Sequence, residues 1–155
     1  MSFETFISDV FVEKKIKDYF VDNLKQYCEG DDAWKIHWNP VGTIERPDDL
    51  YWLDLHFVTN EPFQRELGTY GRNHWSGFLQ VRINTPLDEA DLEGGDSVNS
   101  AMNHCYEDIA RVFRRGTIFN GIRIIKTCRY TSAMQVEDDF CSLPVRIYWE
   151  ADLSN

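Results

Sequence analysis

Between His74 and Gly116 the apolar residues change their spacing from every second position to every third or fourth. The first part alternates as a half-buried strand does, and it stops at Thr85-Pro86. The second part has the three- and four-residue steps of an amphipathic helix. One face of the strand holds Trp75, Leu79, Val81 and Ile83, and the helix stripe holds Val98, Met102, Cys105, Ile109, Val112 and Phe113. We therefore predict a strand that ends at Thr85-Pro86 and a helix over about 97–115. The acidic loop DEADLEGGDS joins them.

Further elements have the same kinds of signal. An amphipathic helix is predicted from about Phe3 to Tyr27, and Gly30 is placed to end it. Asn120-Gly121 is a turn signal. The remaining strands are predicted over residues 34–38, 51–59, 122–129 and 140–151. Pro144 cannot donate to a ladder, so the last strand is predicted to lie at an edge of the sheet or to be bulged there.

The order of these elements is helix, three strands, helix, two strands, which is typical of an α+β domain. We predict a single domain over residues 1–155, with a mostly antiparallel sheet of four to five strands and two helices packed on one face. Hairpin-type pairing is expected between the second and third strands and between the fourth and fifth. A chain of this length can bury such a core without disulfides.

Charge and cysteine usage exclude several classes of protein. The net charge of −10 argues against stable nucleic-acid binding, because gripping phosphates requires a basic surface. No Cys-x-x-Cys pair is present, so reduced thiols in a cytoplasm are expected rather than a zinc or redox motif. The four cysteines are Cys28, Cys105, Cys128 and Cys141. Apolar runs are only a few residues long, so we expect no membrane span and no export signal.

Patterns that would support chemistry are weak. The histidines are not at metal-ligand spacing; His56 and His74 could meet across paired strands, but ordinary sheet residues are the simpler interpretation. The acidic segment 88–96 lacks the alternating ligands of a calcium loop, although weak binding of a divalent cation stays open. Adjacent carboxylates fall in predicted turns, where they are expected to be exposed and screened by water, and nothing in the sequence indicates the burial that acid–base chemistry requires. We predict that the chain is not an enzyme and holds no cofactor or metal.

Five arginines are the candidate interaction residues. Arg111, Arg114 and Arg115 cluster near the negative end of the second helix, where helix capping explains part of the pattern. Arg65 and Arg72 lie in a loop over residues 60–73, longer than usual connections. The planar guanidinium favours carboxylates, so these arginines are predicted to contact an acidic neighbour. The 5 Trp, 7 Tyr and 10 Phe also suit subunit interfaces.

Four segments follow one another in a recognisable order: a strand FLQVRINTP, a helix closing on ARVFRRG, a Gly-Ile-Arg-Ile strand and a last strand LPVRIYWEA. In this order and spacing the chain resembles phage tail terminator-like proteins, a group that includes the tail-completion proteins of long-tailed phages. The resemblance covers roughly the second half of the chain, with looser support from the N-terminal helix.

The resemblance implies a structural protein of the virion tail, assembled in the host cytoplasm. Six copies would form a ring on the head-proximal end of the tail tube, end tube polymerisation and offer a surface to the head-side connector or head-closure protein. The implied partners are further copies of the chain, the major tail tube protein and that connector, with no membrane. DNA would pass through an acidic lumen without specific binding. Alternatives are another head–tail joining component, such as a head-closure or adaptor protein, or a small-ligand-binding α+β module or enzyme.

Overall fold

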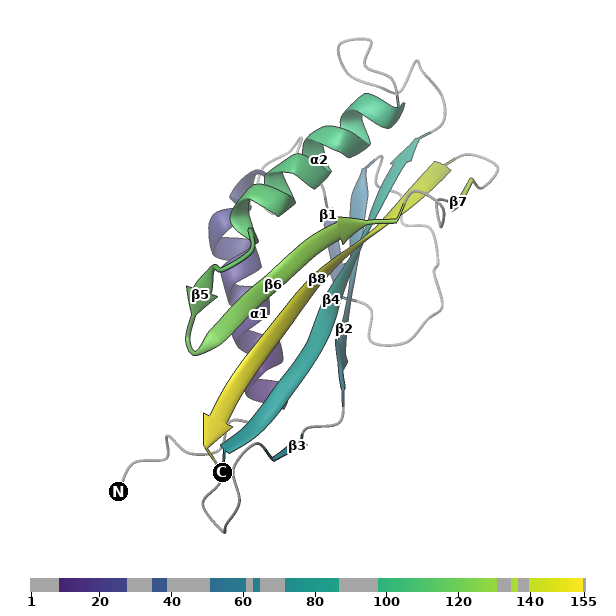
Figure 1. Ribbon diagram of the computed structural model, residues 1–155. Helices are drawn as coiled ribbons and strands as arrows, with labels where there is room; N and C mark the ends of the chain where they lie inside the picture. The colour runs from purple at the N-terminus through teal and green to yellow at the C-terminus, as the bar shows by residue number, and fades with distance from the viewer. Residues whose placement is uncertain are drawn as a thin grey trace.

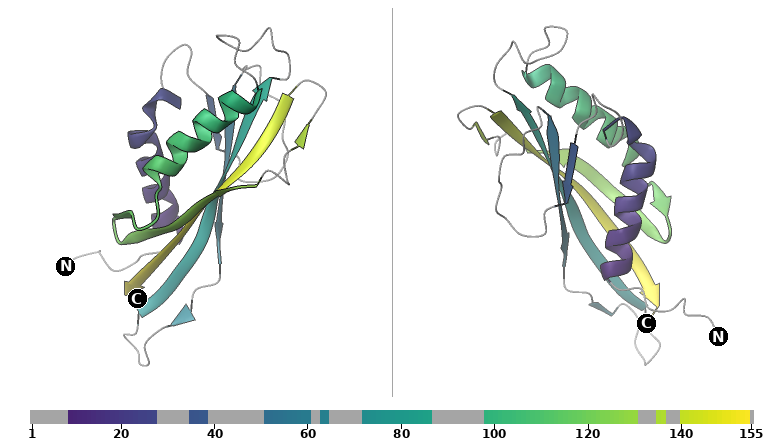
Figure 2. Two further views of the ribbon diagram at one scale, coloured as in Figure 1. Left: turned by 45° about the horizontal axis from the view of Figure 1, so that its top comes forward. Right: turned by 180° about the vertical axis from the view of Figure 1, so that it is seen from behind.

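A computed structural model describes residues 9–27, 35–38, 51–60, 63–64, 72–86, 98–130, 135–136 and 140–154. Within these residues, two helices lie on one side of a twisted, mostly antiparallel sheet (Figure 1). The views in Figure 2 show both helices on the same side. The predicted α+β fold is confirmed.

Long strands dominate the sheet. The strands are β1 (Lys35–Trp38), β2 (Trp52–Thr59), β3 (Phe63–Gln64), β4 (Arg72–Pro86), β5 (Ile118–Phe119), β6 (Ile122–Arg129), β7 (Gln135–Val136) and β8 (Phe140–Ser154). Their order is β1-β2-β4-β8-β6-β5, with β3 on β4 and β7 on β8. The pairs β2·β4 and β6·β8 are antiparallel, as predicted, whereas β1 runs parallel to β2. Strands β4 and β8 pair along their whole length and form the middle of the sheet.

The position of Pro144 corrects one prediction. Strand β8 lies between β4 and β6 and pairs with β4 through Pro144 without a register shift, so the prediction of an edge position or a bulge is wrong. On one side of β8, the ladder with β6 ends at Val145 and the ladder with β7 covers Cys141 and Ser142. The backbone N–H of Tyr130 donates to the Pro144 carbonyl over 2.9 Å. The missing N–H of the proline therefore faces the gap between two ladders, where it interrupts neither of them.

Two helices cover the inner face of the sheet. They are α1 (Asp9–Asn23), followed by the short helix η1 (Lys25–Tyr27), and α2 (Val98–Val112). Both predicted helices are confirmed where the chain is described; residues 3–8 lie outside the described part. The strands contribute alternate residues to the same core, as their period predicts. The core includes Val12, Ile16, Phe20, Met102, Ile109, Phe113, Leu53, Leu79, Val81, Ile83, Val145, Ile147 and Trp149.

A tight hairpin connects α2 to the sheet. The helix gives way to Gly116 in a left-handed conformation (φ 89°), and its N–H donates to the carbonyl of Ile124 over 2.9 Å. Asn120 and Gly121 then both adopt positive φ between β5 and β6, the conformation of a type I′ turn. The hairpin presses the Phe119 ring onto Tyr19 of α1, with ring centroids 4.1 Å apart and planes 4° from parallel. This contact ties the two helices to one end of the sheet.

Candidate functional site

The arginines predicted at the end of α2 are found there, but two of them interact with groups of the same helix. The Arg111 guanidinium pairs with the carboxylate of Asp108 one turn earlier. Arg114 Nε donates to the Arg111 carbonyl over 3.3 Å, which satisfies a free carbonyl at the helix end. Arg115 is exposed, and no described residue holds it with a hydrogen bond or an ion pair. Helix capping therefore accounts for most of this cluster.

The other two predicted arginines are not brought to that site. Arg65 lies outside the described residues. Arg72 begins β4, opposite Ser154, but its side chain lies outside the described part. Their predicted contact to an acidic neighbour stays a prediction.

A buried tyrosine extends the network around Asp108. The Tyr27 hydroxyl donates to Asp108, whose other oxygen accepts from Arg111. Burial, and then this hydrogen bond, raise the pKa of Tyr27 far above its ordinary value. Burial also raises the pKa of the neighbouring Cys105 thiol. Both groups stay protonated and unreactive near neutral pH, so the network fastens η1 to α2 and offers no nucleophile.

Replacing Tyr27 with phenylalanine is expected to lower the free energy of unfolding by about 1–2 kcal/mol near neutral pH, because Asp108 loses a donor. The folded state holds the Tyr27 proton more tightly than the unfolded chain does. The stability that the hydroxyl contributes is therefore complete below about pH 10 and declines at higher pH. Urea titrations at about pH 8 and about pH 11 should show the wild-type advantage shrinking at the higher pH. An advantage that is the same at both pH values would contradict this role.

Metal and acid–base chemistry find little support. Among the described residues, no group of three or more His, Cys, Asp or Glu side chains could hold a metal ion. The expectation that His56 and His74 could meet is wrong, because β2 places His56 opposite Gln80, six residues along β4 from His74. His74 instead lies near Glu150, with Nε2 and Oε2 3.6 Å apart. The acidic segment 88–96 and Cys28 lie outside the described residues.

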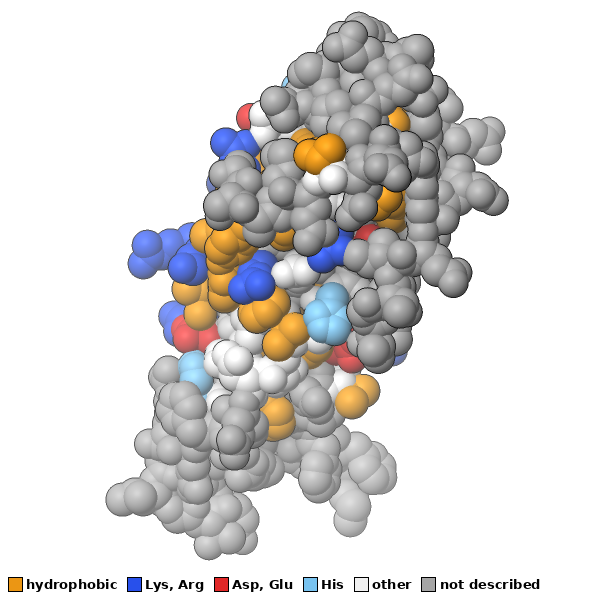
Figure 3. Space-filling model, turned by 90° about the vertical axis from the view of Figure 1, so that its right-hand side faces the viewer, with side chains coloured by type: hydrophobic (Ala, Val, Ile, Leu, Met, Phe, Trp, Pro, Cys, Tyr) orange, Lys and Arg blue, Asp and Glu red, His pale blue; other side chains and the backbone are white. Residues whose placement is uncertain are grey.

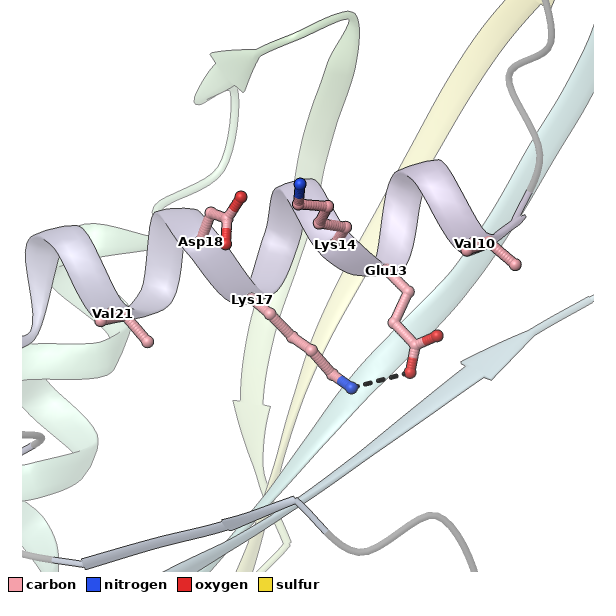
Figure 4. Close-up of a pocket in the computed structure, with 6 residues that line it drawn as sticks. All are labelled: Val10, Glu13, Lys14, Lys17, Asp18 and Val21. Atoms are coloured by element: carbon pink, nitrogen blue, oxygen red, sulfur yellow. Dashed lines mark hydrogen bonds and ion pairs between the residues drawn. The ribbon is translucent and has the colours of Figure 1, made fainter.

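A hollow on the solvent side of α1 is also unsuited to chemistry (Figure 4). It is lined by Val10, Glu13, Lys14, Lys17, Asp18 and Val21. Lys17 pairs with Glu13 over 2.9 Å, one helical turn away. The charges alternate along one exposed helix face, which is the pattern of a solvated surface. Neither described helix has the length and apolar character required to cross a bilayer.

The face of the sheet opposite the helices, here called the outer face, has a different character. Alternation sends Phe78, Arg146 and Tyr148 to this face, since Leu79, Val145, Ile147 and Trp149 beside them are buried in the core. Lys126 joins them because it lies opposite Tyr148 on β6. Figure 3 shows Lys and Arg side chains interleaved with hydrophobic ones on this side. The cation–aromatic cluster consists of Phe78, Lys126, Tyr130, Arg146 and Tyr148.

Close contacts fix the geometry of this cluster. The Arg146 guanidinium carbon lies 4.5 Å from the ring centroid of Phe78 and 5.1 Å from that of Tyr130. Arg146 Nε also donates to Gln80 Oε1 over 3.1 Å. Lys126 Nζ lies 5.0 Å from the Tyr148 centroid. Each cation–π contact contributes about 0.5–1 kcal/mol at such exposed sites, so the guanidinium is held in place before any partner arrives.

The two tyrosine hydroxyls of the cluster share a hydrogen bond. This bond, more than burial, raises the pKa of Tyr130 to about 12. Burial tends to raise the pKa of Tyr148, but the bond from Tyr130 and the neighbouring Arg146 and Lys126 lower it overall. The neighbouring cations therefore favour the charged form of Tyr148.

Beside the cluster, a polar group is satisfied internally. Asn84 is fully buried, and its Nδ2 donates to Asp54 Oδ2 over 3.0 Å and to the Arg82 carbonyl over 3.1 Å. Ser142 donates to the Asn84 carbonyl oxygen. These hydrogen bonds cross-link β2, β4 and β8.

Comparison with known proteins adds no relative. No family model matches the sequence, and no curated protein matches it. The predicted resemblance to tail terminator-like proteins therefore stays a prediction from the order and spacing of the chain's own segments.

Sequence reasoning missed the cation–aromatic cluster. Phe78, Arg146 and Tyr148 occupy outward positions of FLQVRIN and LPVRIYWE, which were used to predict strands and the family resemblance. Lys126 lies in β6, and Tyr130 directly follows that strand. Knowing that β4 and β8 are neighbours, and their register, would have placed Phe78 beside Tyr148 and Gln80 beside Arg146. The sequence does contain these residues at alternate strand positions, but only on the side of each strand that faces away from the core.

Proposed function

We propose that this chain is a structural virion protein that closes the head-proximal end of a phage tail tube as a ring. The ring ends tube polymerisation and forms the interface to the head connector. The order of the sequence segments suggests this family of functions. The observation that carries the proposal is the outer face, where ordered arginine and aromatic side chains lie at the surface. Such residues dominate the binding energy of protein interfaces.

The two unlike faces of the molecule suit a ring. A contact between different surfaces of identical subunits closes into a ring when the rotation between subunits permits it. One face here is covered by α1 and α2, and the other presents the cation–aromatic cluster. Six chains of net charge −10 would also surround a passing DNA with negative potential, which prevents adhesion to its phosphates.

The proposal predicts control of tube length. Tail-tube protein encoded in the same genome is polymerised with and without this chain, and tube lengths are measured by negative-stain electron microscopy. We expect shorter tubes with a ring at one end, because a capped end cannot add subunits. The same length distribution in both samples would argue against a terminator. Binding to the connector with unchanged tubes would instead indicate a head-closure or adaptor protein.

A further inference from the structure

Three cations of the outer face have no carboxylate partner within the described residues, although the chain has 26 acidic and only 16 basic residues. Elsewhere Arg111 pairs with Asp108, and Arg123 pairs with Glu150 at the margin of this face. Among the described residues, no ion pair is formed by Arg82, Lys126 or Arg146. An acid-rich chain that leaves ordered cations unpaired keeps them available for carboxylates of another molecule.

We propose that the cation–aromatic cluster is the contact between neighbouring subunits, and that its occupant is an acidic surface of a second copy of this chain. This inference depends on the proposed ring. The described outer face has more cations than carboxylates, so the remainder of each copy is more acidic than the average of the chain. The cationic outer face of one subunit and the acidic remainder of the next are electrostatically complementary.

The features of the β6 edge favour association through the outer face of the sheet rather than through strand edges. Strand β6 pairs with β5 only at Ile118–Phe119, so most of its outer edge is not covered by β5. At Ile124 that edge bonds the backbone of Gly116 and Thr117. A bulge in the ladder with β8, between Ile124 and Lys126, bends the strand at the next residues, and Lys126 lies beside the bulge. Bulges and lysines are features that hinder pairing of strand edges between molecules. Side chains of the outer face, rather than backbone groups of β6, are therefore expected to make the contact.

The arginine of the cluster suits carboxylates in particular. A guanidinium has five donors in a planar fork. In Arg146, Nε donates to Gln80 and the side chain also hydrogen-bonds Tyr148, which leaves further donors for a carboxylate. Its position beside the Phe78 and Tyr130 rings lowers the entropy lost when a carboxylate binds. DNA phosphates would fit the same donors, but the net charge of −10 repels a polyanion as the protein approaches.

The test compares two variants of equal charge. Lys126→Glu with Arg146→Glu reverses the cluster, whereas Lys14→Glu with Lys25→Glu makes the same change on exposed positions of α1 and η1. Self-association is measured by sedimentation velocity of the free protein and by imaging of tube-bound rings. We expect wild type and the control to associate, and the cluster variant to associate roughly a hundredfold more weakly. Urea midpoints verify that both variants fold.

Cys128 provides a measurement without charge reversal. It lies opposite Arg146 on β6 and is half-buried, whereas Cys105 and Cys141 are buried. In a Cys28→Ser background, its reaction with a maleimide should slow as association increases, and the modified protein should stay monomeric. Labelling that is equally fast in the associated form would overturn the inference.

The outcomes separate this inference from the proposed function. If the cluster variant associates as wild type does, or if wild type is monomeric both free and on tubes, the inference is wrong. If wild type binds duplex DNA and the cluster variant loses that binding while still self-associating, the outer face binds nucleic acid. In that case the inference is also wrong. Association through the cluster with no effect on tube length would refute the proposed function alone.

Discussion

Replacing Gly77 with alanine is expected to lower the free energy of unfolding by about 3 kcal/mol or more. An added Cβ would lie 2.1 Å from the Val58 carbonyl oxygen, and 3.0 Å from both Thr59 Cα and a ring carbon of Trp149. The first two are backbone atoms of β2, which pairs with β4 at this point. They cannot move away without disturbing the ladder. Urea unfolding followed by tryptophan fluorescence measures the loss.

Gly116→Ala is the matched control for this prediction. Gly116 has a positive φ of 89°, but an added Cβ there would meet nothing within 4 Å. Only backbone strain applies, so a loss of about 1 kcal/mol is expected. Equal losses of stability at the two glycines would contradict the claim that steric crowding of the added Cβ destabilises the Gly77 variant.

Replacing Trp149 with alanine is expected to cost about 4 kcal/mol, the largest effect of any single side-chain truncation considered. Trp149 is fully buried, and its ring stacks on Phe57 with centroids 5.5 Å apart and planes 9° from parallel. The ring also packs beside the backbone of Gly77, where a larger residue would displace it. Alanine would leave a cavity in the middle of the sheet.

Tyr148→Ala is the control for Trp149→Ala, because it removes an aromatic side chain at the adjacent position of β8. Tyr148 precedes Trp149 but points to the outer face, where it is only half-buried. Its loss is expected to cost about 1 kcal/mol, from contacts with Lys126 and Phe78. The difference between these adjacent variants follows from the two faces of one strand. Similar costs, measured by the same urea titration, would contradict the assignment of faces.

The fold was largely predictable because its elements have strong local periods. The alternation in β4 and the helical spacing in α2 each give the element and its buried side from neighbouring residues alone. Strand order depends on distant pairings; the two hairpin-type pairings were predicted correctly, but the position of β8 was not. Pro144 suggested an edge, yet β8 lies in the middle of the sheet because two short ladders, to β6 and β7, leave a gap at the proline.

The proposed interaction surface was less predictable than the fold. The arginines at the end of α2 were predicted to contact an acidic neighbour because they are close in sequence. In the structure, Arg111 and Arg114 form hydrogen bonds within their own helix end. The cation–aromatic cluster combines three strands that are distant in sequence. In β6 the bulge before Lys126 also reverses the alternation, so Ile124 faces the helices while Lys126 and Cys128 face outward. No periodic pattern in the sequence reveals such a reversal.

Imaging of the head–tail joint tests the central claim most directly. Under the proposed function the chain belongs to a phage particle, so the head–tail joint of that particle is reconstructed by electron cryomicroscopy. Our account predicts a ring of six copies on the last layer of the tail tube, with the outer face of each subunit against its neighbour. A joint in which every density is explained by other proteins, with this chain absent from the purified particles, would contradict it.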